Sequence, residues 1–205
     1  MKKDSEQEIC NGVLEEAFSL LSLEERTEQK QMAQRIYEAY ENNEIALIEA
    51  GTGIGKSLAY LVPAVLWALK HQEKTIISTH TISLQEQLIH KDLPFLIKAL
   101  GLDIQVMLVK GMNNYLCLRR LDDVEDSKEI DKLKIWGEKT KDGSRSSVPF
   151  PITSSTWDQV KAESDFCTHV HCPHYKQCFF FKARRKVEEA QILIVNHSLL
   201  LTQMV

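Results

Sequence analysis

The sequence predicts an α/β protein with a parallel sheet, interrupted by a mainly helical, cysteine-rich insertion. Three observations lead to this prediction. A glycine-rich loop stands between an apolar run and an apolar helix, and short apolar strands alternate with helices as far as residue 109. The alternation then stops and returns only near the end of the chain. At 205 residues the chain has room for one domain that carries a substantial insertion.

Each element is predicted from the spacing of its apolar residues. Apolar residues that recur every three or four positions indicate a helix, and short, continuously apolar runs indicate strands buried in a sheet. Strands are predicted at 45–48, 74–78, 104–109 and 191–195, and helices at 28–40, 57–69 and 82–89. The order of these elements predicts parallel strands joined by crossover helices.

Residues 111–190 lack this rhythm and form the predicted insertion between two strands of the sheet. The acidic, lysine-rich stretch 121–141 predicts exposed helix, with its charges on a solvated face. Residues 142–153 are rich in Gly, Ser and Pro and predict loops. Residues 167–178 hold three of the chain's five cysteines.

The bulk composition excludes several classes of protein. An apolar fraction of 43% and a charged fraction of 26% are typical of a globular protein, and no apolar run reaches the roughly 18 residues of a membrane span. The N-terminus is acidic where a secretory signal is apolar, so we expect a cytoplasmic protein with reduced cysteines. A net charge of −4 excludes a protein that is basic throughout, but it leaves room for a basic groove.

The glycine-rich loop matches the phosphate-binding pattern A/G-x-x-x-x-G-K-[ST]. Its residues are Ala50, Gly51, Thr52, Gly53, Ile54, Gly55, Lys56 and Ser57. Small residues let the backbone wrap a phosphate chain. The backbone N–H groups and the positive end of the following helix attract its negative charge. We expect Lys56 to reach the β- and γ-phosphates and Ser57 to bind the Mg²⁺ of ATP or GTP.

The cysteines suggest a metal centre. Cys167, Cys172 and Cys178 are spaced C-x₄-C-x₅-C, and Cys117 lies upstream. Four thiolates hold either Zn²⁺ or an iron–sulfur cluster, and the spread spacing fits a cluster better. Two alternatives stay open: a zinc site that also uses the nearby histidines, or buried cysteines with no metal, the class to which we assign Cys10. The histidines are His169, His171 and His174.

Together these segments resemble the iron–sulfur superfamily 2 DNA helicases, and within them the DinG-like bacterial branch. Residues 49–64 are similar to the first motif of that branch, with Ile54 where Thr is usual. Residues 26–32 resemble its R-P-x-Q-x-x-M segment, with Thr27 in place of Pro. The resemblance implies that Gln29 reads adenine, and the alternative is a surface helix residue.

Three further segments extend the resemblance. Residues 79–85 are similar to motif Ia, which implies contacts with a single-stranded backbone through Thr79, Thr81 and Gln85. The alternative is an ordinary turn in which a threonine caps a helix. Residues 110–117 resemble K-G-x-x-N-Y-x-C, which supplies the first cluster ligand of the family, and 195–201 resemble T-N-H-x-L-L-L.

The resemblance implies a division of labour along the chain. Residues 1–110 and 191–205 correspond to part of a RecA-like helicase domain, which ends before the Walker B box, and 111–190 to a 4Fe–4S domain at the junction of duplex and single strand. In this picture Arg184 and Arg185 line the DNA path, with a solvated helix face as the alternative. We expect ATP and Mg²⁺ as ligands, single-stranded DNA and DNA junctions as partners, 5′ to 3′ movement, and a monomer in the bacterial cytoplasm.

The carboxylates that hydrolysis requires are missing from this sequence. No Asp-Glu-x-His stands before Val205, so we expect a piece of a longer enzyme that contains no catalytic residue and does not itself hydrolyse ATP. The alternative is a metal-containing nucleic-acid-binding module that senses nucleotide without motor activity.

Overall fold

The computed structural model describes residues 15–20 and 27–203, so that Cys10 and Arg26 lie outside the description. The chain forms two compact units. One contains the residues up to Leu108 together with those from Ala190 onward, and the other spans Val109–Glu189. Within the described ranges, every helix is too short or too polar to cross a membrane.

The first unit is built on a three-stranded parallel sheet, as predicted. Its strands are β1 (Thr75–Thr79), β2 (Val106–Leu108) and β3 (Ile192–Asn196), in the order β1-β3-β2. The strand that comes last in the sequence is therefore the central one. Its first four residues are buried, as continuous apolar runs in parallel sheets usually are. Mixed helix and parallel sheet confirm the predicted fold class.

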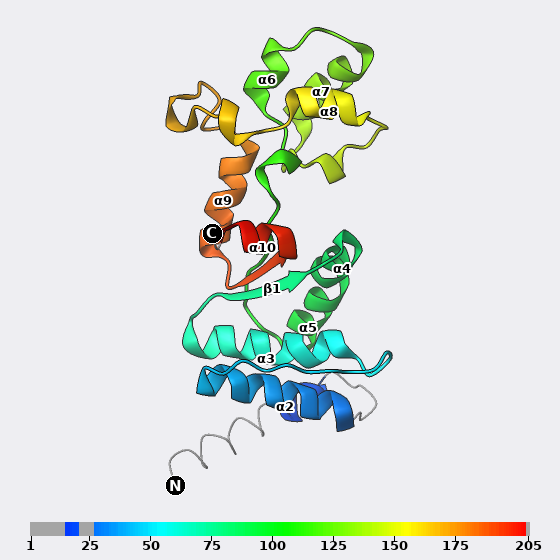
Figure 1. The fold of residues 1–205 in the computed structure, drawn as a ribbon, viewed down its shortest axis with the longest axis vertical. Helices are drawn as coiled ribbons and strands as arrows, with labels where there is room; N and C mark the ends of the chain where they lie inside the picture. Colours follow the sequence, from blue (N-terminus) through cyan, green and yellow to red (C-terminus); the bar gives the residue numbers. More distant parts are fainter. Residues whose placement is uncertain (1–14, 21–26, 204–205) are drawn as a thin grey trace. The chain divides into compact units, whose positions relative to one another are not determined.

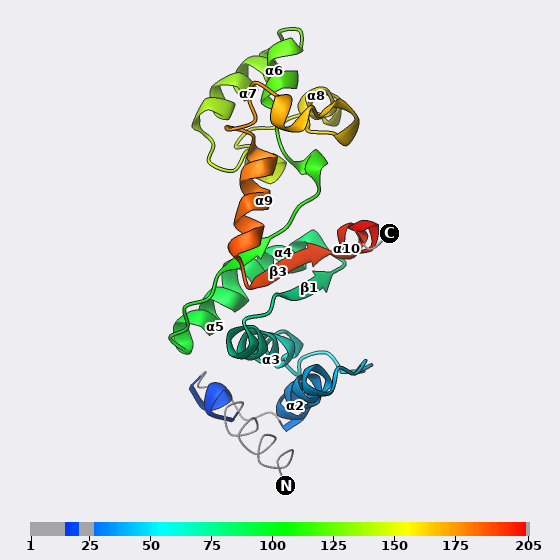
Figure 2. The same ribbon diagram turned by 90° about the vertical axis from the view of Figure 1, so that its left-hand side faces the viewer.

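Helices cover this sheet in layers. Helix α3 (Lys56–His71) packs on the sheet and α2 (Thr27–Asn42) packs on α3, as both views of the ribbon show (Figures 1 and 2). Apolar side chains on every side of α3 make this sandwiched position favourable: seven of its residues are buried. The short helix at 15–20 adds Ala17 and Phe18 to the same core.

The crossover from β1 to β2 is a longer helix than predicted. It begins as α4 (Ile82–Gln87), continues as a π-helical segment (Leu88–Asp92) and ends as α5 (Leu93–Ala99). Thr81 caps its start, because its Oγ1 accepts a hydrogen bond from the N–H of Leu84 at 3.3 Å. Pro94 has no N–H to donate and follows the π-helical segment, where the regular α-helical bonding is already interrupted.

The strand predicted at 45–48 is wrong. Residues 44–50 have no regular secondary structure, and the side chains of Ile45 and Leu47 are fully exposed. An apolar run becomes a strand only where a neighbouring strand pairs with its backbone. Among the described residues, each strand of the sheet pairs elsewhere, and the run stays an extended connection.

The second unit is mainly helical. Its α-helices are α6 (Leu118–Asp123), α7 (Lys128–Lys139), α8 (Ser154–Val160) and α9 (Phe179–Glu189), and its 3₁₀ turns lie at Met112–Asn114, Arg145–Ser147, Ser164–Phe166 and His169–His171. Ser127 and Thr153 cap α7 and α8 with their hydroxyl groups. Beyond the second unit, α10 (His197–Gln203) follows β3 in the first.

The acidic stretch proves to be both helical and partly buried. Its negative charges are solvated as predicted, but Ile130, Leu133 and Trp136 of α7 point into a core of their own. This core also holds Trp157 of α8 and Phe179 of α9. The prediction of an exposed helix rested on the charges and left out three apolar residues that recur between them at helical spacing.

Candidate nucleotide and cysteine sites

The phosphate loop folds into a shape suited to an anion. Gly53 and Gly55 adopt φ values of +85° and +80°, which L side chains rarely adopt. Gly55 precedes α3 and has no side chain to cap it, which leaves the first backbone N–H groups of this helix for an anion. The loop's Thr52 is exposed, and Ile54 and Ser57 are half-buried.

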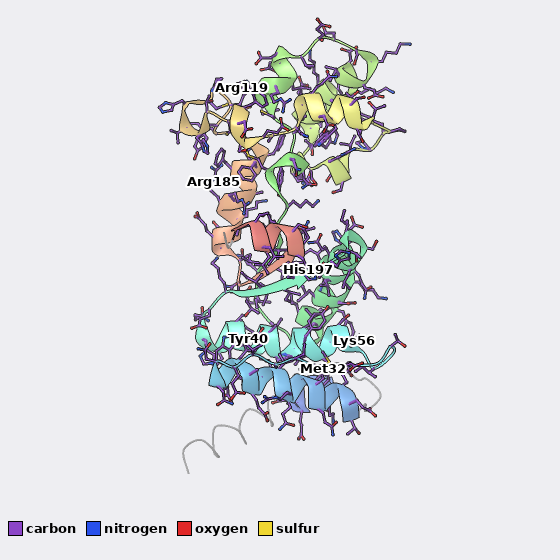
Figure 3. The ribbon with its side chains drawn as sticks, viewed as in Figure 1. Met32, Tyr40, Lys56, Arg119, Arg185 and His197 are labelled. Atoms are coloured by element: carbon purple, nitrogen blue, oxygen red, sulfur yellow. The ribbon has the colours of Figure 1, made fainter. Side chains whose placement is uncertain are left out.

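Lys56 lies against the loop that it follows, at the start of α3 (Figure 3). Its Nζ donates hydrogen bonds of 2.9 Å to the carbonyl oxygens of Ala50 and of Gly51. The ammonium group is therefore held at the mouth of the loop by two exchangeable bonds. A phosphate oxygen is a charged acceptor and would form stronger hydrogen bonds with this ammonium group than either carbonyl oxygen does.

Gln29 connects α2 to the same loop. It is 96% buried, and its Nε2 donates to the carbonyl oxygen of Gly55 at 2.8 Å. The alternative of a surface helix residue is therefore excluded for this side chain. The structure places it beside the phosphate loop.

The contact between Gln29 and Gly55 leads to a first prediction. A Cβ at residue 55 overlaps the carboxamide of Gln29, and an L residue at φ +80° is strained by about 1–2 kcal/mol. We expect Gly55→Ala to fold, because the end of the glutamine is flexible, but to bind ATP about 10-fold more weakly. Isothermal titration with ATP checks this, and unchanged affinity contradicts it.

Three of the five residues predicted to contact DNA lie at the end of β1 or in the helix that follows it, and only one of these three is exposed. Thr79 is buried, and its hydroxyl donates to the carbonyl oxygen of Thr81 at 3.2 Å. Thr81 is exposed and caps α4, and Gln85 is buried. The cap predicted as the alternative therefore exists. Only Thr81 of the three offers its side chain to a ligand at the surface of the described unit.

Sequence reasoning missed a histidine pair at this edge of the sheet. His197 follows β3, and its Nδ1 lies 2.7 Å from Oγ of Ser78 in β1. The exposed ring of His80 lies 6.1 Å from that of His197, centroid to centroid. Because β1 and β3 are adjacent and parallel, the residues that follow the two strands lie close together. A histidine after each predicted strand was therefore the signal in the sequence.

The four predicted cysteine ligands line one cavity of the second unit, with a volume of about 30 Å³. Cys117 and Cys167 reach it from segments fifty residues apart, and Cys172 and Cys178 from the loop that precedes α9. Burial raises the pKa of the Cys178 thiol, although hydrogen bonds from the backbone of Phe181 and Phe180 act in the opposite direction.

The histidines stay outside this cavity. His169 and His171 are exposed, whereas Nε2 of His174 forms an ion pair of 2.9 Å with Oδ2 of Asp122 on α6. This arrangement favours the all-cysteine ligand set over a mixed cysteine and histidine site. Among the described side chains, no three of His, Cys, Asp or Glu stand in a metal-binding geometry.

The basic residues predicted to line a DNA path lie on α9. Arg185 is exposed, and Figure 3 shows its position on the helix. Arg184 is half-buried, with its guanidinium 5.0 Å from the centre of the Phe180 ring. The two neighbours therefore differ: one is free to contact a phosphate, and the other is also part of the packing of the helix.

Comparison with known proteins identifies the family. Residues 26–132 match the model of the DEAD/DEAH box helicase family. The chain is 40% identical to the ATP-dependent DNA helicase YoaA of Escherichia coli over 88% of its length, and 33% identical to the ATP-dependent helicase DinG of Mycobacterium tuberculosis over 90%. It is also 33% identical, over 87% of its length, to a Bacillus subtilis protein named 3′-5′ exonuclease DinG.

The chain covers only part of each of these relatives: 29% of YoaA, 32% of the mycobacterial DinG and 20% of the Bacillus protein. The predicted resemblance to DinG-like helicases is confirmed by these names. The match to the family model spans the glutamine, the phosphate loop and the edge of β1, the features that the fold brings together in the first unit. The chain belongs to the DEAD/DEAH box helicase family.

Proposed function

We propose that this chain is the nucleotide-binding part of an ATP-dependent DNA helicase that moves 5′ to 3′, and that its second unit holds a 4Fe–4S cluster. The observation that carries the proposal is the presence in one chain of a phosphate loop and a four-cysteine cavity. Either feature alone fits many proteins. Their combination, in a chain related to DinG and YoaA, favours an iron–sulfur helicase.

The first unit binds ATP with Mg²⁺ in this proposal. Lys56 leaves the carbonyl groups of Ala50 and Gly51 for the β- and γ-phosphates, and Ser57 offers its hydroxyl to the metal ion. Gln29 hydrogen bonds to the adenine while it remains beside Gly55. No Asp-Glu-x-His occurs in the sequence, so we propose binding without sustained hydrolysis by these 205 residues alone.

The second unit binds the cluster through Cys117, Cys167, Cys172 and Cys178. Thiolates are the ordinary ligands of such clusters, and all four side chains already face one cavity. When bound, the cluster supplies a rigid cross-link between segments that are distant in the sequence. The unit then acts at the junction of duplex and single-stranded DNA, with Arg184 and Arg185 along the path of the strand. At the edge of the first unit, Thr81 contacts the strand with its exposed side chain, and the buried Thr79 and Gln85 support this edge from within.

The cofactor is tested by purifying the whole chain without oxygen and measuring iron, acid-labile sulfide and zinc. We expect about four irons and four sulfides per chain. The matched pair of variants is Cys167→Ser, expected to lose the iron, and Cys10→Ser, expected to keep it. One zinc per chain without iron contradicts the cluster, and iron that survives in Cys167→Ser contradicts the ligand assignment.

DNA binding is tested separately with the same protein. We expect a labelled single strand to bind, with an affinity that falls steeply with salt because counterions are released from the phosphates. Arg185→Gln is expected to reduce this salt dependence by about one ion, since one phosphate contact is lost. Binding that is absent at low salt contradicts a role in contacting the strand.

A further inference from the structure

Helix α6 carries side chains that hold the cysteine-bearing segments in place. Cys117 directly precedes this helix, and Arg119, Arg120 and Asp122 lie on it. Each of the three contacts a different stretch of the chain between residues 158 and 174. The helix that starts at one cysteine is thereby tied to the segments that bear the other three.

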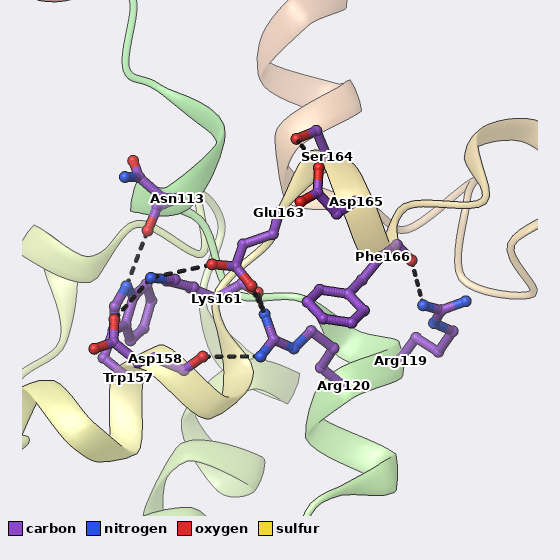
Figure 4. Close-up of polar contacts among 10 residues, drawn as sticks. All are labelled: Asn113, Arg119, Arg120, Trp157, Asp158, Lys161, Glu163, Ser164, Asp165 and Phe166. Atoms are coloured by element: carbon purple, nitrogen blue, oxygen red, sulfur yellow. Dashed lines mark hydrogen bonds and ion pairs between the residues drawn. The ribbon is translucent and has the colours of Figure 1, made fainter.

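Arg120 makes the most extensive of these contacts (Figure 4). Its Nη1 donates to the carbonyl oxygen of Lys161 at 2.9 Å and to Oε2 of Glu163 at 2.6 Å, and its Nη2 donates to the carbonyl oxygen of Asp158 at 2.9 Å. The side chain is only 20% exposed. A planar guanidinium has donors on two terminal nitrogens and can satisfy three such acceptors at once, whereas a lysine ammonium has a single nitrogen.

Its acceptors are themselves held. Nζ of Lys161 lies 2.8 Å from Oδ1 of Asp158 and 3.2 Å from Oε1 of Glu163. The guanidinium of Arg120 also lies over the ring of Phe166, at 4.9 Å from its centre. The carboxylate of Glu163 therefore contacts both Arg120 and Lys161. These contacts hold the segment from Asp158 to Glu163 in one arrangement.

The same two segments are joined through their backbones and by Arg119. The N–H of Cys117 donates to the carbonyl oxygen of Val160, and that of Ala162 to the carbonyl oxygen of Tyr115, both at 2.8 Å. Nη2 of Arg119 donates to the carbonyl oxygen of Phe166, the residue immediately before Cys167. The positions of Cys117 and Cys167 thus depend on contacts that involve no metal.

The loop with the other two cysteines is attached more loosely. The N–H groups of Cys172 and Cys178 donate to carbonyl oxygens only three residues away, at 3.0 Å and 3.3 Å. An ion pair between His174 and Asp122 joins this loop to α6, and the aspartate side chain is 60% exposed. A solvated ion pair of this kind contributes little to stability.

We propose that Arg120 is a positioning residue that fixes Cys117 and Cys167 as a preformed half-site, onto which the loop of Cys172 and Cys178 closes when the cofactor binds. This proposal rests on the proposed function, in which the four cysteines hold a cluster. A half-site fixed in advance lowers the entropic cost of ligation. Loss of such supporting contacts typically weakens metal binding by about 10–100-fold.

The test compares Arg120→Lys, which keeps the charge, with Arg145→Lys as the matched control. Arg145 lies in the same unit, and its Nη2 donates to the exposed Ser154. In anaerobically purified whole chain, we expect Arg120→Lys to release iron to a chelator about 10–100-fold faster than the parent, and Arg145→Lys to release it at the parent rate. Glu163→Gln, which keeps the two backbone acceptors of Arg120 and removes only the charge of the third, is expected to lie between them.

A second readout needs no cluster. In the iron-free chain, we expect the amides of Cys117 and Ala162 to be protected from hydrogen exchange and to exchange faster in Arg120→Lys. If the chain purified without oxygen contains no iron, and the two amides still exchange faster in Arg120→Lys, the proposed cofactor is contradicted but the positioning role of Arg120 stands. If Arg120→Lys releases iron at the parent rate, and its two amides also exchange at the parent rate, the positioning role of Arg120 is overturned. Should Arg120→Lys fail to fold, Glu163→Gln decides by the same two measurements.

Discussion

Lys56→Met is expected to weaken ATP binding by about 10–100-fold, the value of a hydrogen-bonded charge facing phosphate oxygens. In the free protein the ammonium group donates to the carbonyl oxygens of Ala50 and Gly51, so it already lies at the loop that is proposed to hold the phosphate chain. Methionine has a similar length and no charge. Titration with ATP in the presence of Mg²⁺ measures the loss.

Lys98→Met is the matched control. Lys98 is an exposed lysine near the end of α5, in the same unit but outside the loop. We expect it to bind ATP as the parent does. Both variants are expected to melt close to the parent temperature, because each lysine is exposed. Equal ATP affinity in Lys56→Met and the parent contradicts the assignment of the loop.

The sheet and the loop could be predicted because local signals decide them. The run at Ile192–Asn196 is apolar in its first four residues, and the run at Thr75–Thr79 has two isoleucines between residues of high strand propensity; both are strands. The run that contains Ile45 and Leu47 carries the same local signal and remains unpaired. Its backbone lacks a neighbour among the described strands, and pairing is a property of the fold rather than of the segment.

The support of the cysteines could not be predicted for a related reason. The cysteines are visible as a pattern, but Arg120 and its three acceptors are separated by 38 to 43 residues, and nothing in the sequence pairs them. Arg119 and Arg120 read as two surface charges on a short helix. The chain has to fold before their contacts with the segment that ends at Cys167 exist.

Gly143 shows how closely the second unit is packed round this site. Its φ is +59°, and its carbonyl oxygen accepts a hydrogen bond of 2.9 Å from the N–H of Leu116, the residue before Cys117. A Cβ at residue 143 overlaps the ring of Phe179, with the Cδ1 atom only 2.7 Å away. Phe179 is buried and directly follows Cys178. Gly143 therefore lies against both Leu116, the neighbour of Cys117, and Phe179, the neighbour of Cys178.

Gly143→Ala is expected to destabilise the second unit by about 2–5 kcal/mol, the sum of left-handed backbone strain and overpacking against a ring. Urea unfolding followed by tryptophan fluorescence measures this, because Trp136 and Trp157 both lie in the core of this unit. The displaced ring also moves Cys178, so we expect less iron per chain in the purified variant.

Gly101→Ala separates the two causes. Gly101 has φ +61°, and a Cβ there meets nothing within 4 Å, so this variant carries the backbone strain without the clash. We expect it to cost only about 1–2 kcal/mol. Combining Gly143→Ala with Phe179→Leu makes room for the methyl group, and the two changes together are expected to cost less than the sum of each alone. Strict additivity, or equal costs for the two glycine variants, contradicts the contact between Gly143 and Phe179 as the source of the loss.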